Sequence, residues 1–292
     1  MPAKYSIKDL ERLSGIKAHT LRIWEQRYGI LAPERTATNI RWYMAEDLRK
    51  ILNISVLNNH GIKISRIAQL SDEEINEQVR RFTENQIDEN EQVTSLVIAM
   101  IEFDENRFEK IISGCILRFG FERTIETILF PFFRKIGVMW QTGSINPVQE
   151  HFISNLFRQK LIVAIDGIIP DARRDQKTFV LFLPSNELHE LSLLYYAYKI
   201  KARGHKLIYL GQSVPFDDLE RSFDLRRPDF FLTIFTHDMK EINLNDYLYR
   251  LSITFPDTPV LVSGFQLLKR KISLPSNIIL FSNSEDIEQH IR

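Results

Sequence analysis

The sequence of 292 residues contains a single cysteine, Cys115, and only 11 glycines and 11 prolines. One cysteine excludes a disulfide framework and any cysteine-based zinc or iron–sulfur site. No apolar run approaches the roughly 18 residues that cross a bilayer, and the N-terminus lacks the basic-then-apolar order of a signal peptide. We therefore expect a cytoplasmic protein with no membrane partner. The composition that remains, 44% hydrophobic and 26% charged, is that of a globular chain with about two domains.

The net charge of zero hides an uneven distribution of charge along the chain. Residues 1–71 carry 12 basic and 6 acidic residues, a net +6, whereas residues 72–110 carry 4 and 12, a net −8. A basic segment beside an acidic one indicates a basic module with a polyanionic partner. Nucleic acid is the first candidate for that partner.

Residues 1–71 have the pattern of a winged helix-turn-helix. Ser14-Gly15 forms a turn between two short helices, and Gly29 ends the second. Pro33 and many polar residues predict a loop with a short hairpin over residues 30–43, which would form the wing. Apolar residues at helical spacing predict the helices, over residues 8–13, 17–28, 45–59 and 62–70.

Polar side chains on the second helix and on the wing are the candidate DNA contacts. A recognition helix reaches base edges with its N-terminal residues, and arginine donates two hydrogen bonds to a phosphate. The candidates are Lys17, His19, Thr20, Arg22 and Arg27 on the helix, and Arg35, Asn39 and Arg41 on the wing. The alternative, a merely solvated basic face, agrees less well with the turn, the wing and the charge together.

These residues also carry a resemblance to a known family. Residues 15–29 (GIKAHTLRIWEQRYG), then Pro33-Glu34-Arg35, Asn39-Ile40-Arg41-Trp42-Tyr43 and Asp47-Leu48, resemble the MerR family of transcription regulators. Members are dimers that bind inverted repeats and distort DNA, so the resemblance adds Tyr28 and Tyr43 to the expected contacts. Trp24 stands where many members have tyrosine. Arg-Tyr-Gly after Glu25 and Gln26 resembles the light-sensing, cobalamin-dependent repressors of carotenoid genes.

The rest of the chain divides into two regions of different character. Residues 72–171 have helical periods and predict a bundle, with helices over residues 92–102, 105–119, 121–141 and 147–168, the third kinked at Pro131. Residues 177–292 alternate apolar strands with amphipathic helices, which predicts a flavodoxin-like five-stranded parallel sheet. The strands are expected at residues 178–183, 207–210, 230–235, 260–262 and 278–281. The fold class is thus multidomain, α plus α/β, with domains 1–71, 72–171 and 177–292.

A helical bundle followed by such a sheet resembles the cobalamin-binding unit of corrinoid methyltransferases and of the light-sensing repressors. In the latter, a tryptophan and a Glu-His pair cover the upper face of the cofactor. Trp140, Glu150 and His151 have this spacing here. The residue-level alternative is a core tryptophan and an ordinary helix start.

The loop after the first strand provides the second part of this resemblance. Corrinoid proteins place Asp-x-His-x-x-Gly there, with the histidine on cobalt and the acid on the other ring nitrogen. This chain has Glu187 and His189 in those roles, which makes His189 the expected metal ligand, but Ser192 replaces the glycine. A side chain there would crowd the corrin or its nucleotide tail.

Two further corrinoid motifs are altered. The motif that normally meets the nucleotide base is represented by Thr233-Ile234-Phe235, with a bulky Phe235. The expected Gly-Gly pair is Ser263-Gly264. The axial chemistry is kept while the tail pocket is changed, which agrees best with cobalamin binding. Weak binding, a different corrinoid and complete loss of the cofactor are the alternatives.

We interpret the sequence as a non-enzymatic, DNA-binding regulator that binds adenosylcobalamin and forms a dimer or tetramer. Bound cofactor would favour the oligomer, and light would dissociate it. One alternative is a regulator whose sensor has lost corrinoid and acts through protein interaction. A second is a corrinoid shuttle protein for methyl transfer. The predicted DNA-binding domain over residues 1–71 argues against this second alternative.

Overall fold

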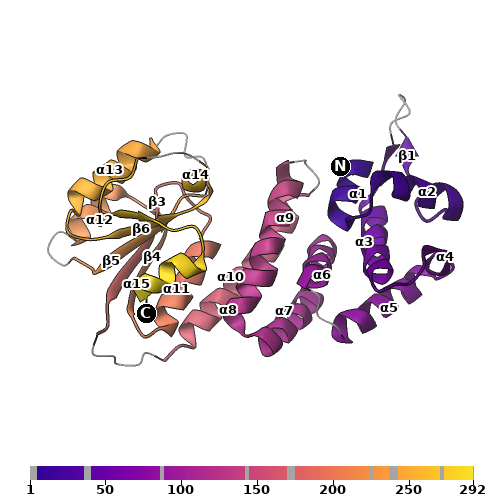
Figure 1. Cartoon of the computed structure of the whole chain (residues 1–292), viewed down its shortest axis with the longest axis horizontal. Coiled ribbons are helices and arrows are strands. Elements are labelled where there is room, and N and C mark those ends of the chain that lie inside the picture. The colour runs from indigo at the N-terminus through magenta and orange to yellow at the C-terminus, as the bar shows by residue number, and fades with distance from the viewer. Residues whose placement is uncertain are drawn as a thin grey trace. The chain divides into compact units, whose positions relative to one another are not determined.

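The computed structural model describes residues 5–35, 41–85, 89–141, 145–169, 175–223, 227–236, 243–269 and 273–291. The chain forms two compact units, residues 1–156 and 157–292. Figure 1 shows the indigo-to-magenta helices of the first unit and the orange-to-yellow sheet of the second. The predicted division into three domains at residues 71 and 171 stays a prediction.

The N-terminal part of the first unit is a winged helix-turn-helix, as predicted. Ser6 caps α1 (Ile7–Ser14): the Asp9 amide donates to its Oγ, and its own amide donates to Asp9 at 2.7 Å. Gly15, at φ +76°, ends α1 in the left-handed conformation. The helix α2 (Ala18–Tyr28) ends the same way at Gly29. Antiparallel β1 (Glu34–Arg35) and β2 (Arg41–Trp42) form the wing.

Helices make up the rest of this unit. They are α3 (Ala45–Asn59), α4 (Ile64–Ile67), α5 (Asp72–Asn85), α6 (Glu89–Glu102), α7 (Glu105–Phe119), α8 (Phe121–Thr124), α9 (Phe130–Gln141) and the start of α10 (Pro147–Asp166). The helix expected over residues 62–70 is only the short α4, because residues 68–70 form turns.

The predicted irregularity at Pro131 takes the form of a π-helical turn, Ile125–Leu129, between α8 and α9. Proline has no N–H to donate to the carbonyl four residues before it, and its ring clashes with that carbonyl. The Phe130 amide instead donates to Ile125, five residues back. The wider turn lets the helix continue through the proline.

The second unit is a parallel sheet covered by helices on both faces. Its described strands are β3 (Thr178–Pro184), β4 (Lys206–Val214), β5 (Phe230–Ile234), β6 (Val260–Ser263) and β7 (Ile278–Leu280), in the order β4-β3-β5-β6-β7. The chain passes from β3 to its neighbour β4 and then crosses to β5, on the other side of β3. The strand order therefore reverses at β3. Ligands of such sheets bind beyond the carboxyl ends of the strands at this point.

The helices of this unit are α11 (Leu191–Ala202), α12 (Phe216–Phe223), α13 (Leu244–Thr254), α14 (Phe265–Leu268) and α15 (Ser284–Ile291). Figure 1 shows α12 and α13 on one face of the sheet and α11 and α15 on the other. Helix α11 begins only at Leu191, because residues 185–190 form an irregular loop after β3.

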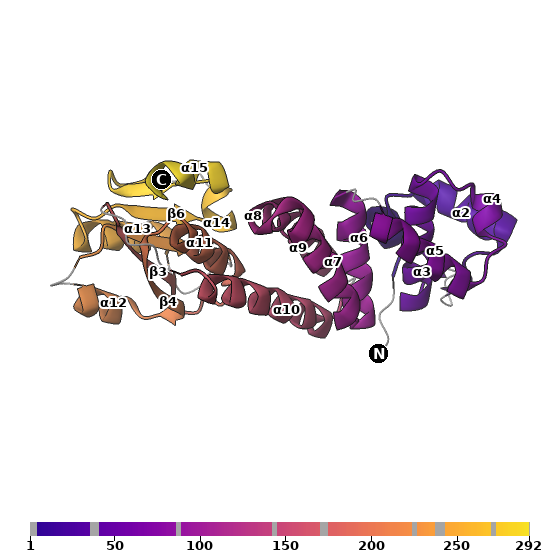
Figure 2. The same ribbon diagram turned by 90° about the horizontal axis from the view of Figure 1, so that it is seen from below.

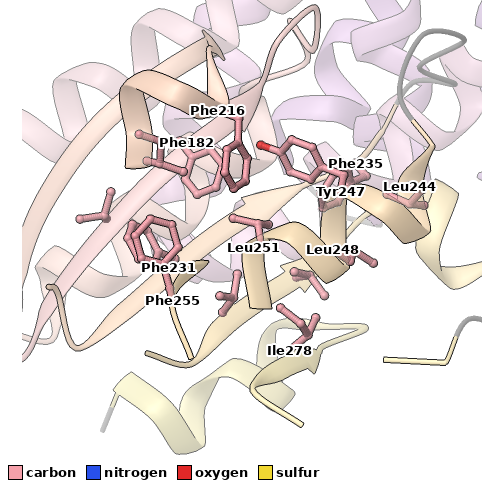
Figure 3. Close-up of a cluster of buried hydrophobic side chains, with 14 of the residues drawn as sticks. Phe182, Phe216, Phe231, Phe235, Leu244, Tyr247, Leu248, Leu251, Phe255 and Ile278 are labelled. Atoms are coloured by element: carbon pink, nitrogen blue, oxygen red, sulfur yellow. The ribbon is translucent and has the colours of Figure 1, made fainter. Parts of the chain in front are cut away.

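An aromatic core lies between the sheet and α12 and α13. Figure 3 shows Phe216 of α12 and Tyr247 of α13 above the sheet, with ring centroids 5.5 Å apart. Phe231 of β5 stacks obliquely on Phe255 at 4.5 Å. Burying such rings supplies most of the free energy that holds helices on the sheet.

Candidate DNA-binding surface and ligand site

Helix α2 exposes most of its polar side chains and packs against α1. Leu21 and Trp24 are buried. Of the predicted contacts, Lys17, His19, Arg22 and Arg27 are exposed, and Thr20 and Tyr28 are half-buried. The expected recognition face is therefore accessible along the helix.

A half-buried acid of α2, Glu25, connects the wing to this helix. Its carboxylate accepts a hydrogen bond from the Arg41 Nε at 3.2 Å and from the Tyr43 hydroxyl at 3.3 Å. Burial, and then Glu25, raise the pKa of Tyr43 to about 12, so the phenol remains a donor. Sequence reasoning missed Glu25, since sixteen residues separate it from Arg41.

The wing residues differ in how far they reach the surface. Arg35 is exposed and Arg41 is half-buried. Tyr43 is 0% exposed, so the prediction that it contacts DNA is not supported by this placement, and its hydroxyl instead orients Glu25. Asn39 lies outside the described residues.

Two helices of the bundle, α9 and α6, contact the DNA-binding part of the chain, residues 1–71 (the reader). Lys135 of α9 donates to the Leu13 carbonyl, at the end of α1, over 2.7 Å. Burial lowers the pKa of Lys135 to about 8. His60, which follows α3, lies 3.0 Å from Glu91 of α6, and both side chains are largely buried. The reader and the bundle therefore share polar contacts within the first unit.

The predicted upper-face residues lie on α9 and α10. Trp140, near the end of α9, is 49% exposed, which does not fit the alternative of a core tryptophan. The His151 Nδ1 lies 3.0 Å from Glu150 in the first turns of α10, and the histidine is mostly exposed. Gln149 fixes this start of α10, since its amide donates to the Ile101 carbonyl. Trp140 and the Glu150–His151 pair are thus available to a ligand.

The predicted cobalt ligand, His189, lies in the loop after β3 and is held by hydrogen bonds to Glu187. The His189 Nδ1 lies 2.7 Å from Glu187 Oε1, and the His189 amide donates to the same oxygen at 3.0 Å. The other oxygen of Glu187 accepts from the Thr236 amide, after β5, at 2.9 Å. Glu187 is fully buried, whereas the His189 side chain is 60% exposed. With Nδ1–H donating to Glu187, Nε2 carries the lone pair that binds a metal.

The other candidate ligand residues lie at the start of α11 and at the carboxyl ends of β5 and β6. Thr233 is fully buried, and its hydroxyl has no hydrogen-bond partner within the described parts of the chain. Ser192 is half-buried in the first turn of α11, and Ser263 is buried at the end of β6. A corrinoid fits this set in two respects: one imidazole is pre-oriented, and a buried hydroxyl at the end of β5 lacks a hydrogen-bond partner among the described residues.

Phe235 and Gly264 have a simple packing explanation. The Phe235 ring belongs to the core between the sheet and α13, 5.8 Å from the ring of Tyr247 (Figure 3). At Gly264, φ is +114°, and a Cβ would lie 2.3 Å from the Phe235 carbonyl oxygen. Only glycine is therefore accommodated there, with or without a ligand.

Comparison with known proteins identifies two regions of the chain. Residues 5–74 match the model of the MerR HTH family regulatory proteins, and residues 92–164 match that of the B12 binding domain. The chain thus combines a MerR-type helix-turn-helix with a B12-binding domain. Among the described residues, every helix is too short or too polar to span a bilayer.

The chain is homologous to two repressors of Myxococcus xanthus. It is 28% identical over 267 residues to the HTH-type transcriptional repressor CarH, which covers 89% of this chain and 88% of that protein. It is 28% identical over 228 residues to the repressor CarA, with 76% and 73% covered. A monomethylamine corrinoid protein of Methanosarcina barkeri aligns in structure with a TM-score of 0.49 and 10% identity, over 73% of this chain and 95% of that one.

Proposed function

We propose that this protein is a transcriptional regulator that binds operator DNA through α2 and the wing and senses a cobalamin through the rest of the chain. The exposed cations of α2 and the +6 charge of residues 1–71 support the DNA partner. The observation that carries the cobalamin partner is His189, whose ring is exposed while a buried acid fixes its Nδ1. One imidazole is what a protein supplies when a macrocycle provides the other ligands.

The candidate residues then take the following roles. His189 ligates cobalt, and Glu187 fixes the tautomer and strengthens the ligand. Trp140, Glu150 and His151 would be further contacts of the cofactor. Ser192, Thr233, Ser263 and Gly264 lie near the nucleotide tail. When bound, adenosylcobalamin supplies a cobalt–carbon bond that light breaks.

We propose that the cofactor controls the oligomeric state. Bound adenosylcobalamin favours an oligomer whose several reader heads hold the operator together. Multivalent binding is stronger than that of one head because the second contact is intramolecular. Dissociation of the oligomer in the light would then release the DNA. This is a shift of population, with no turnover of substrate.

The first test is spectroscopic. The purified chain is mixed with adenosylcobalamin in the dark, free cofactor is removed, and the absorption spectrum is recorded before and after green light. We expect a retained red cofactor whose spectrum changes on illumination. His189→Ala should lose the histidine-ligated spectrum after light, whereas His19→Ala, which changes an exposed histidine of the reader, should behave as the wild type.

Phe235 supports a second candidate function, a regulator that has lost corrinoid. Its ring already fills the apolar core beside the end of β5, where the resemblance places the nucleotide base. A chain that stays colourless after incubation would favour this candidate and leave the DNA reader intact. It would then direct attention to a protein partner of the sensor.

A further inference from the structure

Glu190, the residue after His189, is a second buried acid in the same loop. It is 5% exposed. One carboxylate oxygen forms an ion pair with the Nε of Arg158, on α10. The other accepts a hydrogen bond from the hydroxyl of Tyr209, on β4, at 2.8 Å. Glu190 therefore joins three elements of the second unit: the loop after β3, α10 and β4.

The backbone of Glu190 is fixed as well. Its amide donates to the Leu188 carbonyl at 3.0 Å, and its carbonyl accepts the first helical hydrogen bond of α11, from Leu194, at 2.8 Å. A carboxylate this deeply buried is stable only when it is paired and hydrogen-bonded. The two side-chain partners of Glu190 therefore determine where the residue can lie.

The end of β4 holds the remainder of the loop. The Gln212 amide donates to the Leu188 carbonyl at 2.6 Å, and the Asn186 amide donates to the Ser213 hydroxyl at 3.1 Å. Asn186 and Ser213 both have positive φ, +69° and +52°. Residues held in this strained region require surroundings that over-determine them.

We propose that Glu190 is a positioning residue for His189, and that it acts through Arg158 and Tyr209. Glu187 orients the imidazole ring, whereas Glu190 fixes the backbone that carries it. The consequence of this positioning of His189 for cobalamin binding rests on the proposed function. The effect on the ring itself is a property of the protein without ligand. Burial and the hydrogen bond to Glu190 raise the pKa of Tyr209, which keeps its hydroxyl a donor.

The first measurement uses the ligand-free full chain labelled with ¹⁵N-histidine. The ring signals of His189, assigned with His189→Gln, report its tautomer. We expect one fixed Nδ1–H tautomer in the wild type and signals averaged between tautomers in Glu190→Ala. Glu190→Gln, which keeps an acceptor for Tyr209, should partly restore the fixed tautomer.

The second measurement adds cob(II)alamin and records the electron paramagnetic resonance spectrum. Splitting by one imidazole nitrogen should be present in the wild type and reduced in Glu190→Ala, with cobalamin affinity lower by roughly 10- to 100-fold. The matched control is Glu288→Ala. Glu288 pairs with Lys199 and Arg203 in the last turns of α11, so its loss disturbs the same helix at the opposite end.

The outcomes separate this inference from the proposed function. Unchanged ring signals in Glu190→Ala would overturn the inference, as would the same change in Glu288→Ala. A fixed ring in the wild type without nitrogen splitting would refute cobalt ligation, and the ring signals alone would then decide the role of Glu190. If Glu190→Ala does not fold, Tyr209→Phe decides, because it removes one hydrogen bond and should change the tautomer in the same direction.

Discussion

Glu25 shows how one half-buried carboxylate can join a recognition helix to the wing beside it. Its two partners, Arg41 and Tyr43, lie on and next to β2, while Glu25 belongs to the recognition helix. Arg41 is therefore held against α2, with 35% of its side chain exposed. A fixed guanidinium loses less conformational freedom when it contacts a phosphate than a free one.

Replacing either candidate arginine of the reader should weaken DNA binding. Arg22→Ala and Arg41→Ala should each cost about 1–3 kcal/mol, and loss of a phosphate contact should lower the salt dependence by about one ion. The measurement is fluorescence anisotropy with a duplex from upstream of the protein's own coding region, at several salt concentrations. Lys206→Ala removes an exposed cation of β4 and serves as the control. Binding unchanged relative to this control would refute the assignment.

Gly264→Ala should destabilise the second unit. The new Cβ would lie 2.3 Å from the Phe235 carbonyl oxygen, at φ +114°, so we expect a loss of about 1–3 kcal/mol or more. Urea unfolding measures the change. Gly114→Ala is the matched control, because no atom lies within 4 Å of its Cβ in α7 and the substitution should stabilise the helix by about 0.5–1 kcal/mol. Equal stability of the two variants would contradict the clash.

At the scale of elements, α9 and α10 each carry a candidate ligand contact and a residue that anchors another part of the chain. α9 contacts the reader through Lys135 and carries the candidate ligand contact Trp140 five residues later. α10 carries His151 and, seven residues later, Arg158, the anchor of Glu190. Seven residues are about two turns, so both side chains lie on similar faces of one helix. Figure 2 shows α10 as uninterrupted along its length.

Lys135 gives the protein a specific dependence of stability on pH. Its pKa is about 8 in the folded protein and 10.5 ordinarily. Between these values the unfolded chain binds more protons, so this group makes stability rise with pH, by up to about 3 kcal/mol. Lys135→Met should remove that rise, so its stability relative to the wild type should fall from pH 7.5 to 10.5. Urea unfolding at several pH values measures it, and parallel curves would be inconsistent with a buried ammonium group.

Much of the element pattern could be predicted, because strands buried on both faces are nearly continuous apolar runs. β4 is the instructive exception. Its apolar run ends at Leu210, yet the strand continues to Val214 because its irregular pairing with β3 tolerates polar residues at the edge. The Glu187–His189 pair could be predicted because its members are two residues apart. Glu25 and Glu190 could not, since folding alone brings their partners close.

At the scale of the whole molecule, the proposed function connects two binding events. Residues 1–71, with a net charge of +6, would bind DNA, and the rest of the chain would bind cobalamin. We predict that light changes the oligomeric state of the cofactor-bound protein. Light scattering coupled to size-exclusion chromatography should show a dark, adenosylcobalamin-bound oligomer that becomes smaller after green light, together with weaker operator binding. His189→Ala should alter the light-dependent change of mass, and His19→Ala, whose substitution lies in the DNA-binding helix, should keep that change of mass. An unchanged mass in darkness and light would contradict oligomer control.

The buried carboxylate of Glu187 also bears on how such sensors change during descent. It accepts from the Thr236 amide as well as from His189, so it joins the loop after β3 to the segment after β5 through contacts that involve no ligand. Its loss would leave the part-buried Thr236 N–H without this partner. A descendant that abandoned the cofactor would therefore keep the acid and be free to change the exposed histidine. Under the proposed function, we therefore expect related chains that have lost the cofactor to differ at position 189 before they differ at position 187.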